Sequence, residues 1–141
     1  MKVLIDTCIV IDVLQDRKPF SKSGQKIFLA AANHRCDAFL TANSITDIYY
    51  LAHRHFHNHK DTKSIIKSLF TLFGILDTCG IDCKKAIISE VKDYEDAVMI
   101  ETALRSGIDC IVTRNESDYS KAGITVYSPE TFLAVLDEIT A

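Results

Sequence analysis

Four aspartates stand where a folded α/β chain could bring them together. They end or follow predicted strands, or open predicted helices: Asp6, Asp47, Asp96 and Asp118. In open α/β sheets the carboxyl ends of the strands form the ligand crevice, so acids that are distant in the chain can meet there. The sequence therefore predicts an acidic pocket at that edge of the sheet.

A cluster of three or four carboxylates needs a cation. Two carboxylates about 5 Å apart repel by roughly 3 kcal/mol at an effective dielectric constant of about 20. Oxygen ligands favour Mg²⁺ or Mn²⁺ over zinc, and Mg²⁺ takes its remaining ligands from water and substrate phosphate. Such an ion activates a bound water and stabilises charge on an attacked phosphate, so the natural substrate is a phosphodiester.

Two of the aspartates also have a purely structural interpretation. Asp6 could end a strand or cap the helix that follows it. Asp118, within the segment NESDYS, could be a loop residue whose side chain bonds to the backbone nearby. Either interpretation would leave the pocket without that carboxylate.

The other two aspartates resemble parts of helix caps. Ser44-x-x-Asp47 and Asp93-x-x-Asp96 both match the capping box, in which the acid bonds back to the cap amide. Asp96, however, shares a helical face with Ile100. Its carboxylate is therefore expected to point toward the core, where a buried acid needs a partner.

Strands and helices are expected to alternate along the chain. Apolar runs predict strands at residues 2–6, 37–42, 74–78, 109–114 and, at the edge, 124–129. Helical spacing predicts helices at residues 9–15, 21–34, 43–56, 62–73, 83–91, 93–107 and 129–139. The expected caps and ends are Asn43 or Ser44, Asp93, Gly107 and Pro129. This order predicts an α/β domain around a parallel sheet.

A histidine occurs at every second position of the stretch LAHRHFHNHKD, at His53, His55, His57 and His59. The flanking pattern is helical, so histidines four apart are expected to pair, in two pairs about 200° apart around the helix. Because no nearby acid completes a metal site, a solvated helix end is the preferred interpretation. Contact of this stretch, with Arg54 and Lys60, to phosphates is the alternative.

Composition narrows the class of protein. With 141 residues and 48% hydrophobic content, one compact domain spanning 1–141 is expected. The absence of a long apolar run and of a signal peptide predicts a cytoplasmic protein without a membrane partner. A net charge of −3 argues against a basic coat for duplex DNA but leaves nucleic acid open. The five cysteines are expected to be reduced, and Cys79-x3-Cys83 lacks a second pair for zinc.

Four segments contain the acids and the residues around them: VLIDTCIVIDVL, LTANSITDIYYLAHR, DYEDAVMIETALRSGIDCIVTRNESDY and VYSPETFL. In these segments the chain resembles the PIN domains, which include VapC-type toxin ribonucleases. The resemblance covers essentially the whole chain. It implies a three-layer α/β/α fold around a mostly parallel, roughly five-stranded sheet, a four-acid pocket holding Mg²⁺ or Mn²⁺, and hydrolysis of single-stranded RNA. It also implies a small antitoxin partner and a homodimer.

Position by position, the resemblance assigns roles to the acids. Asp6, Asp96 and Asp118 would hold the metal ion. Asp47, where many members have glutamate, would orient or deprotonate the attacking water. Asn115 stands where many relatives have aspartate, and it would keep an oxygen ligand while losing a charge.

The resemblance also indicates residues around the acids. Thr113 and Ser44 match small hydroxyl positions that support the pocket or a phosphate. Arg114 is a candidate phosphate contact, and a salt bridge to a neighbouring acid is an equal alternative. Asp12 is interpreted as a structural residue or one that acts behind the metal ligands.

Three functions are compatible with these residues. The leading hypothesis is a metal-dependent endoribonuclease, either a toxin or a housekeeping enzyme of RNA processing. The second is a PIN-like module with weakened chemistry that binds RNA or protein, which Asn115 favours. The third is an aspartyl-phosphate domain, which would need a lysine partner or an Asp-x-Asp motif where the chain has Asp6-Thr7-Cys8.

Overall fold

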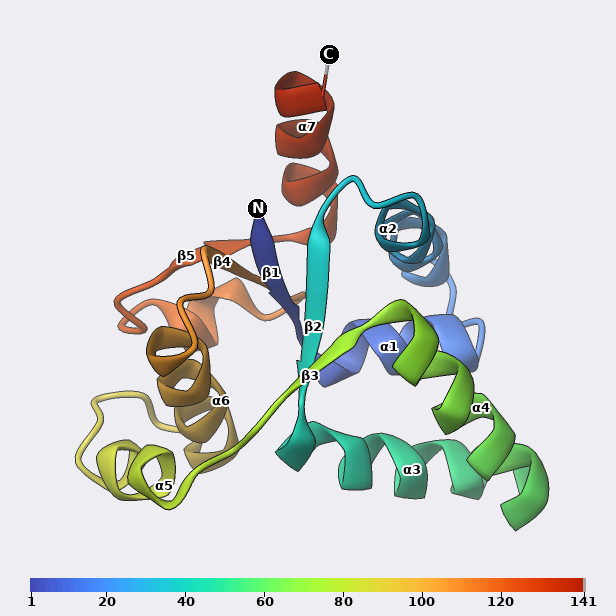
Figure 1. Ribbon diagram of the computed structural model, residues 1–141, viewed down its shortest axis with the longest axis horizontal. Helices are drawn as coiled ribbons and strands as arrows, with labels where there is room; N and C mark the ends of the chain where they lie inside the picture. The colour runs from blue at the N-terminus through green and yellow to red at the C-terminus, as the bar shows by residue number, and fades with distance from the viewer. Residues whose placement is uncertain (141) are drawn as a thin grey trace.

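The chain winds alternating strands and helices around one sheet (Figure 1). The computed structural model describes residues 1–140. The strands are β1 (Lys2–Ile5), β2 (Asp37–Thr41), β3 (Gly74–Leu76), β4 (Cys110–Val112) and β5 (Thr125–Tyr127). The helices are α1 (Thr7–Leu14), α2 (Ser21–Ala32), α3 (Ala42–Phe56), α4 (His59–Leu72), α5 (Gly80–Ile87), α6 (Tyr94–Arg105) and α7 (Pro129–Thr140), with a 3₁₀ turn η1 (Glu116–Tyr119).

The strand order is β3-β2-β1-β4-β5, and all four strand pairs are parallel. From β1 the chain builds outward to β2 and β3, then crosses back to add β4 and β5 on the other side. The order therefore reverses between β1 and β4, where the carboxyl ends of the strands border a crevice. Both the parallel sheet and the edge position of β5 confirm the sequence-based prediction.

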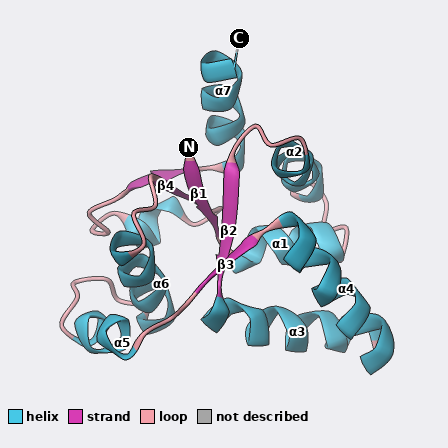
Figure 2. Ribbon diagram, in the orientation of Figure 1, coloured by secondary structure: helices cyan, strands magenta, loops and turns pink. Residues whose placement is uncertain are grey.

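Two apolar cores lie on opposite faces of the sheet. Val3 and Ile5 of β1 pack into one core, with α1 to α4 and α7, while Leu4 packs into the other, with α5, α6 and η1. Successive strand residues face opposite sides, and both sides are covered here, which explains the unbroken apolar run of β1. The helices flank the strands on both sides in Figure 2, so the three-layer α/β/α architecture is confirmed.

Several helix ends follow their predicted caps. The Asp93 side chain accepts a hydrogen bond from the backbone of Asp96 at the start of α6. Gly107 follows α6 with φ +70°, a conformation that favours glycine, and Pro129 opens α7.

Other helix starts differ from the prediction because different side chains provide the caps. Thr41, not Asn43 or Ser44, caps α3, and its hydroxyl accepts from the backbone N–H of Ser44 at 3.2 Å. Asn58 caps α4, so this helix begins at His59, earlier than expected. The helix predicted at 83–91 lies instead at Gly80–Ile87. It begins earlier because Cys79 is its N-cap, and the Asp82 carboxylate accepts a hydrogen bond from the Cys79 backbone N–H.

Among residues 1–140 no helix is long and apolar enough to cross a bilayer. All five cysteines are free thiols, in agreement with the sequence-based expectation.

Candidate active site

Asp6 lies directly after β1, at the point where the strand order reverses. Its backbone N–H bonds to the carbonyl of Val112 at 3.0 Å, and its side chain is 9% exposed. The carboxylate makes no cap bond to α1. Instead its Oδ2 accepts hydrogen bonds from Thr113 Oγ1 at 2.7 Å and from the Tyr119 hydroxyl at 3.2 Å. Asp6 therefore occupies the N-cap position of α1, as one interpretation expected, but its carboxylate does not cap the helix.

Tyr119 connects Asp6 to Asp96. The ring is buried, and its hydroxyl also lies 3.1 Å from Asp96 Oδ1. Burial and the two carboxylates raise the pKa of Tyr119, so its single proton stays on the phenol. One proton serves only one of two acceptors at a time. Asp6 also accepts from Thr113, so Asp96 is the carboxylate left without a donor whenever Tyr119 donates to Asp6. No sequence pattern indicated this contact, because Tyr119 lay in a predicted loop.

Burial is the main cause that raises the pKa of Asp96 to about 6, and the charges of Asp6 and Asp93 raise it further. The Tyr119 hydrogen bond acts in the opposite direction but does not cancel these effects. Only half of the predicted capping box forms here, because the Asp96 carboxylate turns to Tyr119. The pair of carboxylates thus carries charge that the surrounding protein compensates incompletely.

A hollow of about 270 Å³ opens above these acids. Its four acidic lining residues are Asp6, Asp47, Glu95 and Asp96. Asp47 is half-buried on α3 and belongs to no capping box, since Thr41 caps this helix. Glu95 was not singled out in the sequence. The charge of Asp47 is the first cause that raises the pKa of Glu95, so the two side chains sense each other across the hollow.

Asp118 and Asn115 are not among the residues that line this hollow. Both are exposed, and Asp118 borders a neighbouring hollow together with Lys92 and Lys121. Its charge still contributes to the raised pKa of Asp96. Within residues 1–140, no three side chains of the histidine, cysteine or acidic types form a ready metal-binding group.

Of two other predicted residues, Thr113 bonds to one of the acids, whereas Ser44 bonds to Thr41. Ser44 borders the hollow, and its hydroxyl shares a 2.7 Å hydrogen bond with Thr41. Thr113 is fully buried, and its hydroxyl donates a hydrogen bond to the Asp6 carboxylate. Thr113 therefore positions a carboxylate.

Arg114 forms an ion pair rather than facing the hollow. Its guanidinium donates to both oxygens of Asp12, at 2.6 and 3.1 Å, and lies 4.0 Å above the centre of the Phe20 ring. The Asp12 side chain is only 2% exposed. Of the two alternatives for Arg114, the structure shows the salt bridge, and the structural interpretation of Asp12 agrees with it.

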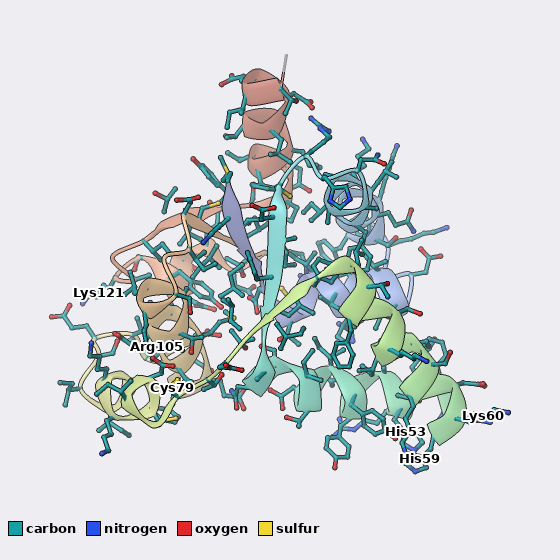
Figure 3. All side chains as sticks on the ribbon, viewed as in Figure 1. His53, His59, Lys60, Cys79, Arg105 and Lys121 are labelled. Carbon is teal, nitrogen blue, oxygen red and sulfur yellow. The ribbon has the colours of Figure 1, made fainter. Side chains whose placement is uncertain are left out.

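The histidine stretch spans a turn between two helices. α3 ends at Phe56, His57 has φ +57°, and α4 begins at His59. The rings of His53 and His59 stack at 3.8 Å, side by side in Figure 3. The expected pairing of histidines four apart is therefore wrong, because the chain reverses at His57. Desolvation, followed by the charges of His59 and His57, lowers the pKa of His53.

Residues 2–117 match the family model of the PIN domain, and the chain belongs to this family. Ribonuclease VapC1 of Aquifex aeolicus (strain VF5) is 28% identical over 137 residues, which cover 93% of this chain and 92% of that protein.

Solved structures agree with the fold. A DNA-bound VapBC from Salmonella typhimurium has a TM-score of 0.68 at 16% identity, over 92% of this chain and 98% of that chain. VapBC2 from Rickettsia felis, bound to a promoter DNA fragment, has a TM-score of 0.67 at 12% identity, over 91% and 98%. A toxin-antitoxin complex from Klebsiella pneumoniae has a TM-score of 0.66 at 20% identity, over 90% and 97%.

Proposed function

We propose that the protein is a metal-dependent endoribonuclease that hydrolyses phosphodiester bonds in single-stranded RNA. The observation that carries this proposal is the pair of carboxylates, Asp6 and Asp96, joined through Tyr119 at the floor of a hollow. The hollow lies at the reversal of strand order, where α/β folds bind ligands. Membership of the PIN family and the similarity to a ribonuclease over most of the chain support it.

The chemistry of the donor set fits a hard divalent cation. Asp6 and Asp96 offer carboxylate oxygens, which suit Mg²⁺ or Mn²⁺. The Cys8 thiol lies 3.6 Å from Asp6 Oδ2, but burial and the charge of Asp6 raise its pKa to about 11, so it stays protonated and is not a thiolate ligand. Burial first, and then the charges of Asp6 and Asp93, raise the pKa of Asp96, and a bound cation would offset these effects. When bound there, the ion would lower the pKa of a water molecule and stabilise charge on the phosphate. Asp118 and Asn115 are proposed as further ligands that reach the ion only if η1 shifts.

The chain's own side chains would divide the remaining work. Thr113 and Tyr119 hold the carboxylates of Asp6 and Asp96 in place through hydrogen bonds. Asp47 lines the same hollow from α3 and would orient the attacking water or accept its proton. Ser44 borders the same hollow and is a candidate contact for substrate phosphate.

The test is cleavage of a mixed single-stranded RNA by the purified protein with Mg²⁺ or Mn²⁺, with EDTA as the control. Asp6→Asn and Asp96→Asn should each abolish cleavage, while Asp37→Asn, an exposed acid at the far end of β2, should leave it unchanged. Cleavage that survives EDTA, or that both hollow variants retain, would refute the proposal.

A PIN-like binding module is the second candidate. Asp118 and Asn115 lie outside the hollow, which favours a site with weakened chemistry. Titration with Mg²⁺ in a calorimeter separates the two functions. Binding that Asp96→Asn removes supports the nuclease, whereas no binding at millimolar Mg²⁺ together with intact RNA affinity supports the module.

We also propose that the protein is a cytoplasmic toxin held by a small antitoxin, and that it forms a homodimer. The similar structures from Klebsiella pneumoniae and Salmonella typhimurium are described as a toxin-antitoxin complex and a DNA-bound VapBC, which supports an antitoxin partner here. Co-purification with the product of a small neighbouring open reading frame tests the antitoxin. Light scattering tests the dimer, which should have twice the 15.8 kDa mass of the chain.

A further inference from the structure

One wall of the hollow is a stripe of α3 that the catalytic proposal leaves largely unused. Asn43, Asp47, Tyr50 and Arg54 line the hollow and recur at helical spacing along one face. α3 leads away from the carboxyl edge of the sheet (Figure 1), so the stripe runs from the acids toward the surface. A nucleic-acid strand with one phosphate bound at the acids would therefore lie next to this face of α3.

Arg54 supplies charge that this hollow otherwise lacks. Among the hollow's lining residues within 1–140, Arg54 alone is cationic, against four acids. Its side chain is exposed and makes no ion pair with the residues that the structure describes. Arg114, the arginine that the sequence indicated for phosphate, is already bound to Asp12. An unpaired guanidinium facing a phosphodiester site is suited to binding a backbone phosphate.

Tyr50 supplies an aromatic surface one helical turn before Arg54. Its side chain is 62% exposed although it borders the hollow, and its ring packs only edge-on against Tyr49, at 5.5 Å and 88°. Tyr49 in turn stacks against His53 and His59, both at 6.0 Å. Tyr49, itself packed against the two histidines, thus contacts Tyr50 edge-on, and much of Tyr50 stays accessible to solvent.

We propose that Tyr50 and Arg54 form a nucleotide subsite of this hollow. Tyr50 stacks on an unpaired base next to the phosphate at the acids, and Arg54 binds a phosphate of the same strand. The inference rests on the proposed function, because it names how the RNA lies in that site. Stacking on one exposed ring requires a base that is free of its neighbours, so the subsite accepts single strands and discriminates against duplexes.

The test is the affinity for a fluorescein-labelled single-stranded oligoribonucleotide, measured by anisotropy. The Asp6→Asn protein in EDTA serves as the background, since this change lowers the negative charge of the hollow and prevents cleavage. Tyr50→Ala should weaken binding about 5- to 150-fold, and Tyr50→Phe should stay within about 2-fold of the background. Tyr94→Ala, at a tyrosine 45% exposed on α6 outside the hollow, is the matched control and should change nothing.

Arg54→Ala should weaken binding and reduce the slope of log K against log salt by about 0.7, the loss of one phosphate contact to a single strand. Tyr50→Ala should leave this slope unchanged. Oligonucleotides with one abasic residue locate the base: the Tyr50→Ala penalty should vanish when the stacked base is missing. A general structural defect would persist with every oligonucleotide.

The outcomes separate this subsite from the proposed function. If the wild type cleaves RNA but Tyr50→Ala changes neither binding nor KM, the subsite is refuted and the nuclease stands. If the Asp6→Asn background fails to bind the oligonucleotide at any concentration tested, the subsite is refuted as well. If Tyr50 and Arg54 control binding but the wild type does not cleave, the subsite stands and the nuclease is refuted.

Discussion

Replacing Asp96 by asparagine should stabilise the metal-free protein at neutral pH. Burial and the charge of Asp6 hold the pKa of Asp96 near 6 in the native state, against an ordinary value of 3.8. Between these two values the native state binds more protons than the unfolded state, so the free energy of unfolding of the wild type falls as the pH rises. Asp96→Asn does not ionise and loses no stability over this window.

The size of the effect follows from the two pKa values. Their difference corresponds to about 3 kcal/mol if the interaction is fully expressed. Asp96 is only partly buried, and screening by solvent reduces the expected gain to about 1 to 2 kcal/mol. The advantage of the variant should be near zero below about pH 4 and complete above about pH 6.

Urea unfolding in EDTA, at several pH values between about 4 and 8, measures this difference. Asp37→Asn is the control, because this exposed carboxylate lies far from Asp6. An offset between Asp96→Asn and wild type that stays constant across the range would refute the reasoning. Millimolar Mg²⁺ should reverse the order, because the wild type gains binding free energy in its native state and the variant gains less.

Three further substitutions test the contacts around the site. Tyr119→Phe removes the hydroxyl shared by two carboxylates, and should raise the pKa of Asp96 further, seen by carboxyl carbon NMR, while lowering stability by about 1 kcal/mol. Arg114→Ala leaves the buried carboxylate of Asp12 unpaired, and should cost about 3 kcal/mol in urea unfolding without the RNA-binding loss expected for Arg54→Ala. Gly107→Ala meets no atom within 4 Å but must keep φ +70°, so backbone strain alone should cost about 1 kcal/mol of thermal stability. Unchanged stability would contradict the reasoning for each substitution.

The sheet was predictable because its strands are short apolar runs between helical patterns. The helix caps were predictable only where one candidate stands alone. Asp93 is such a case, whereas Thr41, Asn43 and Ser44 lie within four residues, and all three have suitable side chains. Which of them caps α3 depends on the backbone angles at the end of β2, where Thr41 is extended.

The contacts of Tyr119 and Arg114 could not be predicted from the sequence, because they join segments that are distant in the chain. Nothing local shows that Tyr119 folds back from η1 to reach Asp6 and Asp96. Arg114 had two chemically equal options, and the position of α1, which carries Asp12, decides between them. The predicted pairing of the histidines was wrong for a local reason. His57 has a left-handed backbone conformation that ends the helix, and the alternating pattern does not reveal it.

Asp6 and Asp118 show why acids with equal sequence support need not have equal positions. Asp6 follows a buried strand, so the sheet itself fixes its carboxylate at the crevice. Asp118 belongs to a 3₁₀ turn, in which neighbouring side chains point in different directions, and its neighbour Tyr119 is the one that faces the acids. The phenol carries one proton for two carboxylates, so this arrangement leaves the charge of the pair partly uncompensated. A bound metal ion would supply positive charge beside the two carboxylates, so the Tyr119 hydrogen bond would contribute less to stability. The free energy of unfolding of the wild type and of Asp96→Asn, each with and without Mg²⁺, measures how much of the carboxylate charge a cation compensates.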